Sequence, residues 1–147
     1  MNKNITDFVL QYERDQFATS TGRAMHKKLQ NVSLAPLQSG DIDLIEKIKN
    51  SDALLQSFFM ENSIPEVPIA GYINGVFMSR RIDRLVIDDA TKIVRVLDYK
   101  TDTDTEKFRA KYIAQLHEYM NLMSQIYPDY KISGYILWLH DWRLENI

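Results

Sequence analysis

The chain has 147 residues, of which 45% are hydrophobic and 26% charged, and this make-up is typical of a single domain over residues 1–147. Its formal net charge of −2 excludes a broadly basic nucleic-acid binder, so any contact with nucleic acid has to come from a local patch. Because there is no cysteine, disulfides, thiolate zinc sites, a cysteine nucleophile and an iron–sulfur cluster ligated by this chain are excluded.

Helical spacing of apolar residues dominates the first part of the chain. We expect four helices there, around residues 8–12, 24–32, 42–48 and 54–59. Ser20 or Thr21 is the N-cap candidate of the second helix, Asp41 opens the third, and Asp52 caps the fourth. The sequence therefore predicts a mainly helical region over residues 1–60.

From residue 64 onward, β-branched and aromatic residues indicate strands. Asn74-Gly75 is typical of a two-residue hairpin turn, and a polar turn over residues 88–91 leads into a third strand that completes an antiparallel meander. The elements expected in this part are strands over 67–73, 76–87 and 92–100, a helix over 108–127, and strands over 131–139 and 142–147. With the helices before them, they predict an α/β (α+β) domain in which helices flank a mixed sheet, the sheet and C-terminal helix occupying residues 64–147.

Three charged residues stand out in the meander. Asp98 and Lys100 lie two positions apart in the third strand and so share one face of the sheet. Pairing Ile87 with Lys92 across the turn places Asp83 one diagonal step from Asp98, on that same face. We therefore expect these two aspartates and the lysine to lie close together.

Converging carboxylates repel each other unless a cation lies between them, and their oxygen atoms suit Mg²⁺ or Mn²⁺. Such an ion polarises a phosphodiester and lowers the pKa of water, while a neighbouring lysine stabilises charge on phosphorus. The same residues also fit a solvated ion pair at a strand end, with Asp83 beside Arg81 or Arg84, and spacing alone does not separate the two interpretations. Gln115 and Tyr119, four apart on the following helix, either reach toward this strand end or line a packed helix face.

Four separated runs of residues carry a family resemblance. They are residues 22–26 (Gly-Arg-Ala-Met-His), 81–85 (Arg-Ile-Asp-Arg-Leu), 96–101 (Val-Leu-Asp-Tyr-Lys-Thr) and 112–119 (Tyr-Ile-Ala-Gln-Leu-His-Glu-Tyr). In this order they resemble the motifs of the RecB-type branch of the PD-(D/E)XK nucleases, and within it the C-terminal nuclease domains of AddA-type helicase–nuclease subunits. The resemblance extends from about residue 20 to the C-terminus. It implies a restriction-endonuclease-like PD-(D/E)XK core and metal-dependent DNA hydrolysis of the kind used in double-strand break repair and recombination.

The resemblance also implies a role for individual residues. Those that would hold Mg²⁺ or Mn²⁺ are His26, Asp83, Asp98 and the backbone carbonyl of Tyr99. Those that would make up the catalytic set are Asp83, Asp98, the catalytic lysine Lys100, Gln115 and Tyr119. The last two match a Gln-x-x-x-Tyr motif that supports the active site and contacts DNA. Glu66 falls where related domains often have a glutamate on the first strand, and its role stays open; taken alone, His26 also fits an ordinary packed or exposed histidine.

Basic residues near these motifs offer a local DNA-binding rim despite the acidic total. The set expected to contact DNA is Arg23, Lys27, Lys28 and Arg84. Arg80 and Arg81 add to this cluster, although Arg80 stands where the family has glycine. Charge runs of this kind are also typical of solvated faces, so the assignment depends on where the folded chain places them.

Partners and location follow from what the sequence lacks. No stretch approaches the roughly 20 apolar residues of a membrane span, so we expect a cytoplasmic protein with no membrane partner. There is no Walker A loop and no room for a helicase motor, so a helicase would be a separate subunit. The chain would then be a stand-alone nuclease, a piece of a longer protein or a remnant.

The leading hypothesis is a Mg²⁺- or Mn²⁺-dependent deoxyribonuclease, with an exonuclease favoured and the choice between exo- and endonuclease left open. The alternative is a catalytically inactive DNA-binding or partner-docking module derived from a helicase–nuclease. A third reading is an α/β domain with no role on nucleic acid.

Overall fold

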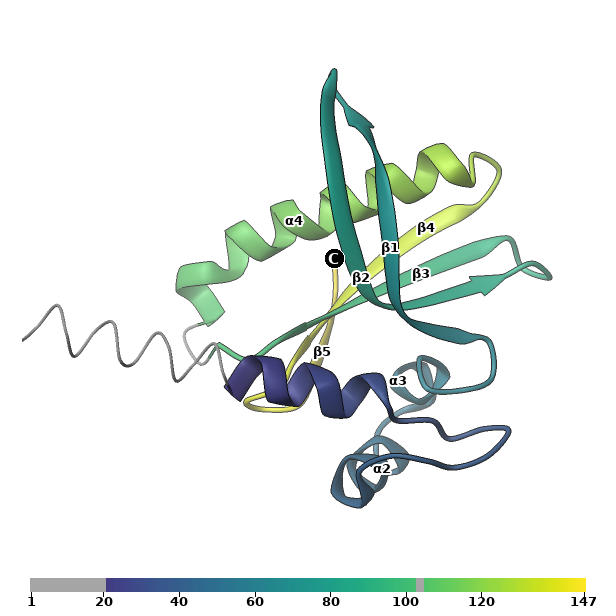
Figure 1. The fold of residues 1–147 in the computed structure, drawn as a ribbon, viewed down its shortest axis with the longest axis vertical. Coiled ribbons are helices and arrows are strands. Elements are labelled where there is room, and N and C mark those ends of the chain that lie inside the picture. The colour runs from purple at the N-terminus through teal and green to yellow at the C-terminus, as the bar shows by residue number, and fades with distance from the viewer. Residues whose placement is uncertain (1–20, 103–104) are drawn as a thin grey trace, which may run out of the picture.

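A computed structural model describes residues 21–102 and 105–147 of the chain. The expected helix around residues 8–12 lies outside this described part. The elements are a helix over residues 21–30, α2 (Ile42–Lys49), α3 (Ala53–Ser57), β1 (Ser63–Ile73), β2 (Val76–Asp88), β3 (Ile93–Lys100), α4 (Thr105–Ile126), β4 (Lys131–Trp138) and β5 (Arg143–Asn146) (Figure 1).

The five strands form one mixed sheet in the order β1-β2-β3-β4-β5. The first three make the predicted antiparallel meander, β4 runs parallel to β3, and β5 returns antiparallel to β4. Parallel neighbours need a crossover connection, and α4 provides it between β3 and β4. The prediction of a mixed α+β domain with a mixed sheet flanked by helices is confirmed.

Helices cover both faces of the sheet, and each face has its own hydrophobic core. Figure 1 shows α4 on one side, with the helix of residues 21–30, α2 and α3 grouped on the other. Alternation along β3 separates the cores, because Val94 and Val96 pack in the cluster that contains α4 residues. Leu97 and Tyr99 pack in the cluster that contains residues of the N-terminal helices. Strand β3 is thus packed on both of its faces, so the backbone that carries its functional groups is fixed in place.

Aspartate side chains begin the two short helices. The carboxylate of Asp41 accepts a hydrogen bond from the Leu44 N–H at 3.0 Å, and that of Asp52 accepts one from the Leu55 N–H at 2.9 Å. Each satisfies a backbone donor that a helix leaves unpaired at its start, so the predicted caps are confirmed.

In the described part of the chain, no helix is long and apolar enough to cross a membrane.

The register of the β2–β3 turn differs from the prediction. We expected Ile87 to pair with Lys92, but in the structure Ile87 faces Val94. The carboxylate of Asp88 accepts hydrogen bonds from two backbone N–H groups of the turn, at 3.0 and 3.2 Å, and the turn occupies residues 89–92. Because side chains alternate with a period of two, this shift by two residues leaves the side chains of the paired residues 84–88 on their predicted faces.

Candidate functional site

Asp83 and Asp98 meet where the β2–β3 ladder ends. The last pair of that ladder is Arg84 with Leu97, so one further step sets Asp83 level with Asp98 instead of on the predicted diagonal. Both aspartates are buried, with 7% and 4% of their surface exposed. The ammonium of Lys100 lies 3.0 Å from Asp98 Oδ2. The structure therefore brings the three predicted residues together at this end of the ladder.

The Asp83 carboxyl has an environment that favours its neutral form. Burial, followed by the nearby charge of Asp98, raises its pKa from 3.8 to about 9. A hydrogen bond from the Tyr99 N–H to Asp83 Oδ2, at 2.8 Å, opposes this rise without cancelling it. In the protein alone, burial and the neighbouring carboxylate thus favour the protonated form of Asp83 over the charged form.

Lys100 is fixed in place by groups from β3 and α4. It donates a hydrogen bond of 2.9 Å to Gln115 Oε1, and its ammonium lies 4.2 Å from the centre of the Tyr112 ring. With the ion pair to Asp98, these contacts hold a side chain that is only 15% exposed. A lysine held in one position can present its charge to a reacting group without reorganising.

Tyr112 is a site residue to which the sequence analysis gave no role of its own, although it begins the motif run of residues 112–119. Its hydroxyl donates a hydrogen bond to Asp102, just after β3, and its ring lies under Lys100. Tyr119, predicted as a catalytic residue, is 5% exposed on α4, and burial and the nearby Asp98 raise its pKa. Tyr112 precedes Gln115 by three residues and Tyr119 by seven, and this spacing on one helix face was the signal that could have identified it.

His26 approaches the aspartates from the helix of residues 21–30. Its Nδ1 lies 3.7 Å from Asp83 Oδ1, and its ring stands edge-on to the Tyr99 ring at 5.5 Å. Burial lowers the pKa of His26 below its ordinary value of 6.5, so the imidazole is neutral at pH 7, the form that binds metals. The helix can come this close because Gly22 faces Thr101, where an added Cβ would lie 3.2 Å from the hydroxyl oxygen.

Arg84 binds the other end of the same helix, and its position differs from the one that the sequence predicted. Its Nη2 donates to the backbone carbonyls of Leu29, Gln30 and Val32 at 2.8, 3.1 and 2.7 Å. These carbonyls lie at or just after the end of the helix, where backbone acceptors run out of intrahelical partners. The guanidinium also lies over the Phe59 ring, and the residue is 3% exposed. The expectation that Arg84 contacts DNA is therefore wrong, because its side chain is buried and bonded to the helix.

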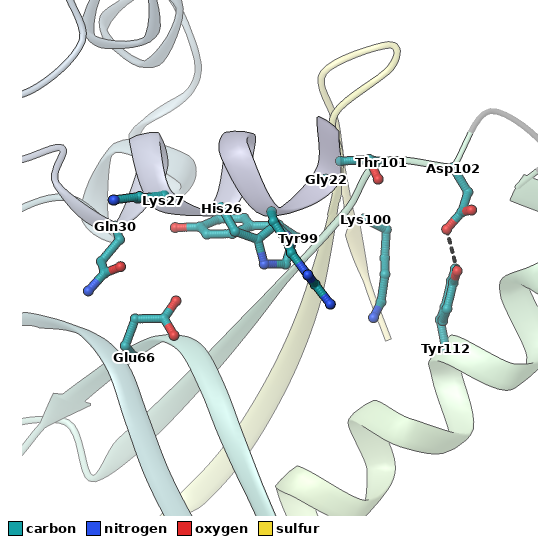
Figure 2. A pocket seen from close by; sticks show the side chains of 11 residues that line it. Gly22, His26, Lys27, Gln30, Glu66, Tyr99, Lys100, Thr101, Asp102 and Tyr112 are labelled. Carbon is teal, nitrogen blue, oxygen red and sulfur yellow. Dashed lines mark hydrogen bonds between the residues drawn. The ribbon is translucent and has the colours of Figure 1, made fainter. Parts of the chain in front are cut away.

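The site opens into a cleft of about 560 Å³ beside the helix of residues 21–30 (Figure 2). The residues that line it are Gly22, Arg23, His26, Lys27, Gln30, Glu66, Tyr99, Lys100, Thr101, Asp102 and Tyr112. Two of the residues expected to contact DNA, Arg23 and Lys27, thus border the cleft. The third, Lys28, lies 3.8 Å from Asp41 and is not among the lining residues.

Glu66 reaches this cleft through an unusual backbone conformation. Its φ is +53°, in the left-handed region that residues with a side chain rarely adopt, and the β1–β2 pairing skips it between Pro65 and Val67. Figure 2 shows its carboxylate pointing into the space beside His26. Backbone strain of this kind is concentrated at functional sites, which makes Glu66 part of the candidate site.

The chemistry of these groups fits a divalent cation. Asp98 Oδ2 is buried and makes no hydrogen bond, although it lies near the lysine charge, and Asp83 is forced toward its neutral form. Oxygen donors of this kind, with a neutral imidazole beside them, match Mg²⁺ or Mn²⁺. Within the described residues, however, no group of three or more His, Cys, Asp or Glu side chains stands close enough together to hold an ion. The two aspartates supply the charge, and a further donor would have to move toward them.

No protein-family model and no curated protein matches this chain. What can be concluded about its function therefore depends on the fold and on the geometry of the site.

Proposed function

We propose that this chain is a Mg²⁺- or Mn²⁺-dependent DNA nuclease with the core of the RecB-type PD-(D/E)XK family. One observation carries the proposal: Asp83 and Asp98 are buried side by side, with Lys100 fixed 3.0 Å from Asp98. Burying two carboxylates together is unfavourable, and a solvated ion pair at a strand end would not need it. The arrangement favours a site where a cation offsets the negative charge.

The residues that would hold the cation are His26, Asp83, Asp98 and the backbone carbonyl of Tyr99. Bound there, Mg²⁺ or Mn²⁺ would polarise the scissile phosphodiester and lower the pKa of water. Asp83 has to give up its proton before it can act as a ligand, so affinity for the cation should rise with pH. The neutral state of His26 at pH 7 is already the ligating form.

Lys100 has the position of the group that stabilises negative charge at the phosphate. Gln115 and Tyr112 hold its ammonium in place, so the charge is available in the transition state without a change of side-chain conformation. Arg23 and Lys27, at the border of the cleft, would contact the DNA backbone and supply the local positive charge that the total of −2 lacks. Exonuclease action in break repair, together with a separate helicase subunit, is the setting that the motifs favour.

A second candidate function is a DNA-binding or partner-docking module without turnover. It is favoured by the lack, among the described side chains, of three donors already gathered around one point. A module of this kind would bind DNA without metal and would not cleave it.

Cleavage assays separate the two candidates. The purified chain is incubated with linear duplex, single-stranded and covalently closed circular DNA, with Mg²⁺ or Mn²⁺ or with a chelator. We expect metal-dependent cleavage of the linear and single-stranded substrates. An exonuclease needs a free end and would leave the closed circle intact. The cleavage rate should fall by about 10²-fold or more in Asp98→Asn and in Lys100→Met. Asp88→Asn, at the half-buried far end of β2, is the matched control and should cleave as wild type. Full activity in Lys100→Met would show that the site is misassigned.

Metal binding can be measured without turnover. At about pH 8, saturating Mn²⁺ should raise the midpoint of thermal unfolding of the wild type, because a ligand that binds only the folded state stabilises it. Asp98→Asn should lose most of this shift, whereas Asp88→Asn should keep it. An equal shift in all three proteins would contradict a cation at the two aspartates.

A further inference from the structure

The β1–β2 hairpin extends well beyond the rest of the sheet (Figure 1). One of its faces packs on α4: Ile69 and Ile82 are buried there, and the carbon of an added side chain at Gly71 would meet Leu122 at 2.9 Å. Arg80 belongs to this face as well, since its Nε lies 3.3 Å from a Glu118 carboxylate oxygen on α4. The inner face of the hairpin is therefore occupied.

The outer face of the hairpin is open along its whole length. Its residues form three cross-strand pairs, all of them exposed: Tyr72 with Phe77, Ala70 with Ser79, and Pro68 with Arg81. The pair at the tip is aromatic, with 63% and 60% of its surface exposed and ring centres 5.5 Å apart. Small side chains follow, and then an arginine, so the outer face is neither a continuous apolar patch nor an ordinary charged surface.

This outer face leads directly to the candidate site. The next position along it after Pro68 and Arg81 is that of Glu66 and Asp83. The Arg81 guanidinium lies 3.8 Å from the Glu66 carboxylate, which places both side chains on one side of the hairpin. Glu66 in turn lines the cleft that holds His26 and Lys100. The exposed face and the cleft thus form a continuous path.

We propose that the outer face of the hairpin is a binding track for single-stranded DNA, which runs from Tyr72 and Phe77 at the tip to the cleft at Asp83. The inference depends on the proposed nuclease function and names the form of its substrate. Exposed aromatic rings are stacking platforms for unpaired bases, whereas the bases of a duplex are already stacked on each other. The outer face carries one arginine, Arg81, and from Val67 to Ile82 the hairpin has no acidic residue, so a polyanion meets no negative charge until it reaches the site.

The length of the track predicts how affinity depends on the length of the single strand. Phe77 precedes Asp83 by six residues. At the rise of an extended strand this is about 20 Å, or about six nucleotides at the spacing of stacked bases. A strand shorter than this cannot occupy the cleft and the aromatic pair at once, so affinity for single strands should increase sharply once they exceed about six nucleotides.

The first experiment measures binding of oligothymidylates of about 4 to about 12 nucleotides by fluorescence anisotropy, with a chelator present so that nothing is cleaved. We expect the wild type to show the step in affinity, and the double variant Tyr72→Ser/Phe77→Ser to lose it, binding the longest oligomer about tenfold more weakly or worse. The matched control Leu37→Ser/Ile42→Ser removes two side chains that are 80% and 79% exposed elsewhere and should bind as wild type. Unchanged binding in the tip variant, or an equal loss for a duplex of the same length, would overturn the track. If the tip docks a protein partner instead, the tip variant should bind the oligonucleotides as well as the wild type does.

A second pair of variants tests the path between tip and site. Arg81→Gln should weaken single-strand binding and reduce the slope of log affinity against log salt by about one. Arg80→Gln changes a neighbouring arginine that faces Glu118 on the opposite side, so it should leave the slope unchanged. Equal slopes in both variants would contradict the path. Because Arg81 is largely exposed, its variant stays informative even if the tip variant folds poorly.

Failure of the track and failure of the nuclease proposal give different results. A wild type that cleaves DNA, with Asp98→Asn inactive but with no step in affinity with length, would overturn the track alone. A wild type that shows the step and its loss in the tip variant, yet cleaves no DNA with either metal, would overturn the nuclease proposal and leave the track in place.

Discussion

The base and the tip of the β1–β2 hairpin both have unusual side-chain burial, but of different kinds. At the base, charged groups are buried, with Asp83 at 7% and Arg84 at 3% exposure. At the tip, large apolar groups are exposed, with Tyr72, Val76 and Phe77 between 58% and 63%. Most proteins bury large apolar groups and keep charges in water, so both ends of the hairpin depart from what stability alone would favour.

The two ends differ in what holds them. At the base, other elements bind the charged groups: Arg84 donates to carbonyls at the end of a helix, and Asp83 accepts from the Tyr99 backbone. At the tip, the Tyr72 and Phe77 side chains contact each other, and the Tyr72 carbonyl accepts one hydrogen bond from Gln125 on α4. Buried charge is tolerated because neighbouring groups are arranged around it, whereas an exposed aromatic pair costs little and needs no support. Changes at the base should therefore affect stability strongly, and changes at the tip should not.

Among changes to the charged groups at the base, the largest effect on stability is expected for Arg84→Met. The substitution removes a buried charged donor from three backbone carbonyls at a helix end, and we expect it to lower the free energy of unfolding by about 2–4 kcal/mol. Denaturant unfolding measures this. Arg95→Met is the matched control, because Arg95, on β3, also lies over a phenylalanine ring, that of Phe58, but makes one long hydrogen bond of 3.4 Å. A loss as large for Arg95→Met would show that the helix-end bonds are not the cause.

A smaller effect is expected from the pH dependence that Asp83 introduces. Its pKa is raised in the folded state, so the stability that it contributes is complete below 3.8 and is lost as pH rises toward about 9. Between about pH 7 and about pH 9, above the range where the lowered pKa of His26 matters, metal-free wild type should lose stability relative to Asp83→Asn. Thermal unfolding at several pH values measures the difference. Asp88→Asn should not change the slope, because the pKa of Asp88 is lowered and its contribution is lost only at acidic pH. Parallel curves for wild type and Asp83→Asn would contradict a protonated Asp83.

A still smaller effect is expected at Gly22. Alanine gains up to about 1 kcal/mol of helix propensity but places a Cβ 3.2 Å from the Thr101 hydroxyl, so the two effects offset each other in Gly22→Ala. In a Thr101→Ala background the close contact is gone, and Gly22→Ala should then stabilise the protein by about 0.5–1 kcal/mol. A double-mutant cycle on unfolding free energies measures this. No difference between the two backgrounds would show that the helix does not depend on this contact.

The smallest effect is expected at the tip. Phe77→Ser removes an exposed side chain and its contact with Tyr72, and should change the free energy of unfolding by less than about 1 kcal/mol. Ile82→Ala, on the same strand but fully buried against α4, should cost about 2–5 kcal/mol. If Phe77→Ser were as damaging as Ile82→Ala, the tip would be part of the core and not a free surface.

Much of the candidate site could be predicted from spacing alone. Period-two alternation placed Asp98 and Lys100 on one face, and the polar turn brought Asp83 onto the same face even though the predicted register was wrong by two residues. Alternation does not change under such a shift, so the neighbourhood of these residues was insensitive to the error. The four-residue spacing of Gln115 and Tyr119 likewise indicated the face of α4 that meets the site.

Other features depended on contacts between residues far apart in the chain. Arg84 is next to Asp83 in the sequence and belongs to a group of arginines that is typical of DNA-binding surfaces. In the structure it points to the opposite face and donates hydrogen bonds to a helix that ends more than fifty residues earlier. Nothing in its local sequence distinguishes it from Arg81, which stays exposed. Only the packing of the N-terminal helix against the sheet separates the two.

The sequence by itself determined the order of helices and strands, the hairpin at Asn74-Gly75 and the faces of the strands, because these follow from local backbone preferences and hydrophobic periodicity. The tertiary structure decided which charges are buried and which remain in water, since that depends on what lies opposite each side chain. It placed His26 3.7 Å from Asp83, buried Arg84 and left the Tyr72–Phe77 pair at the end of an open face. Burial and distance are properties of the packed chain, and they turn a spacing of charged residues into a candidate site.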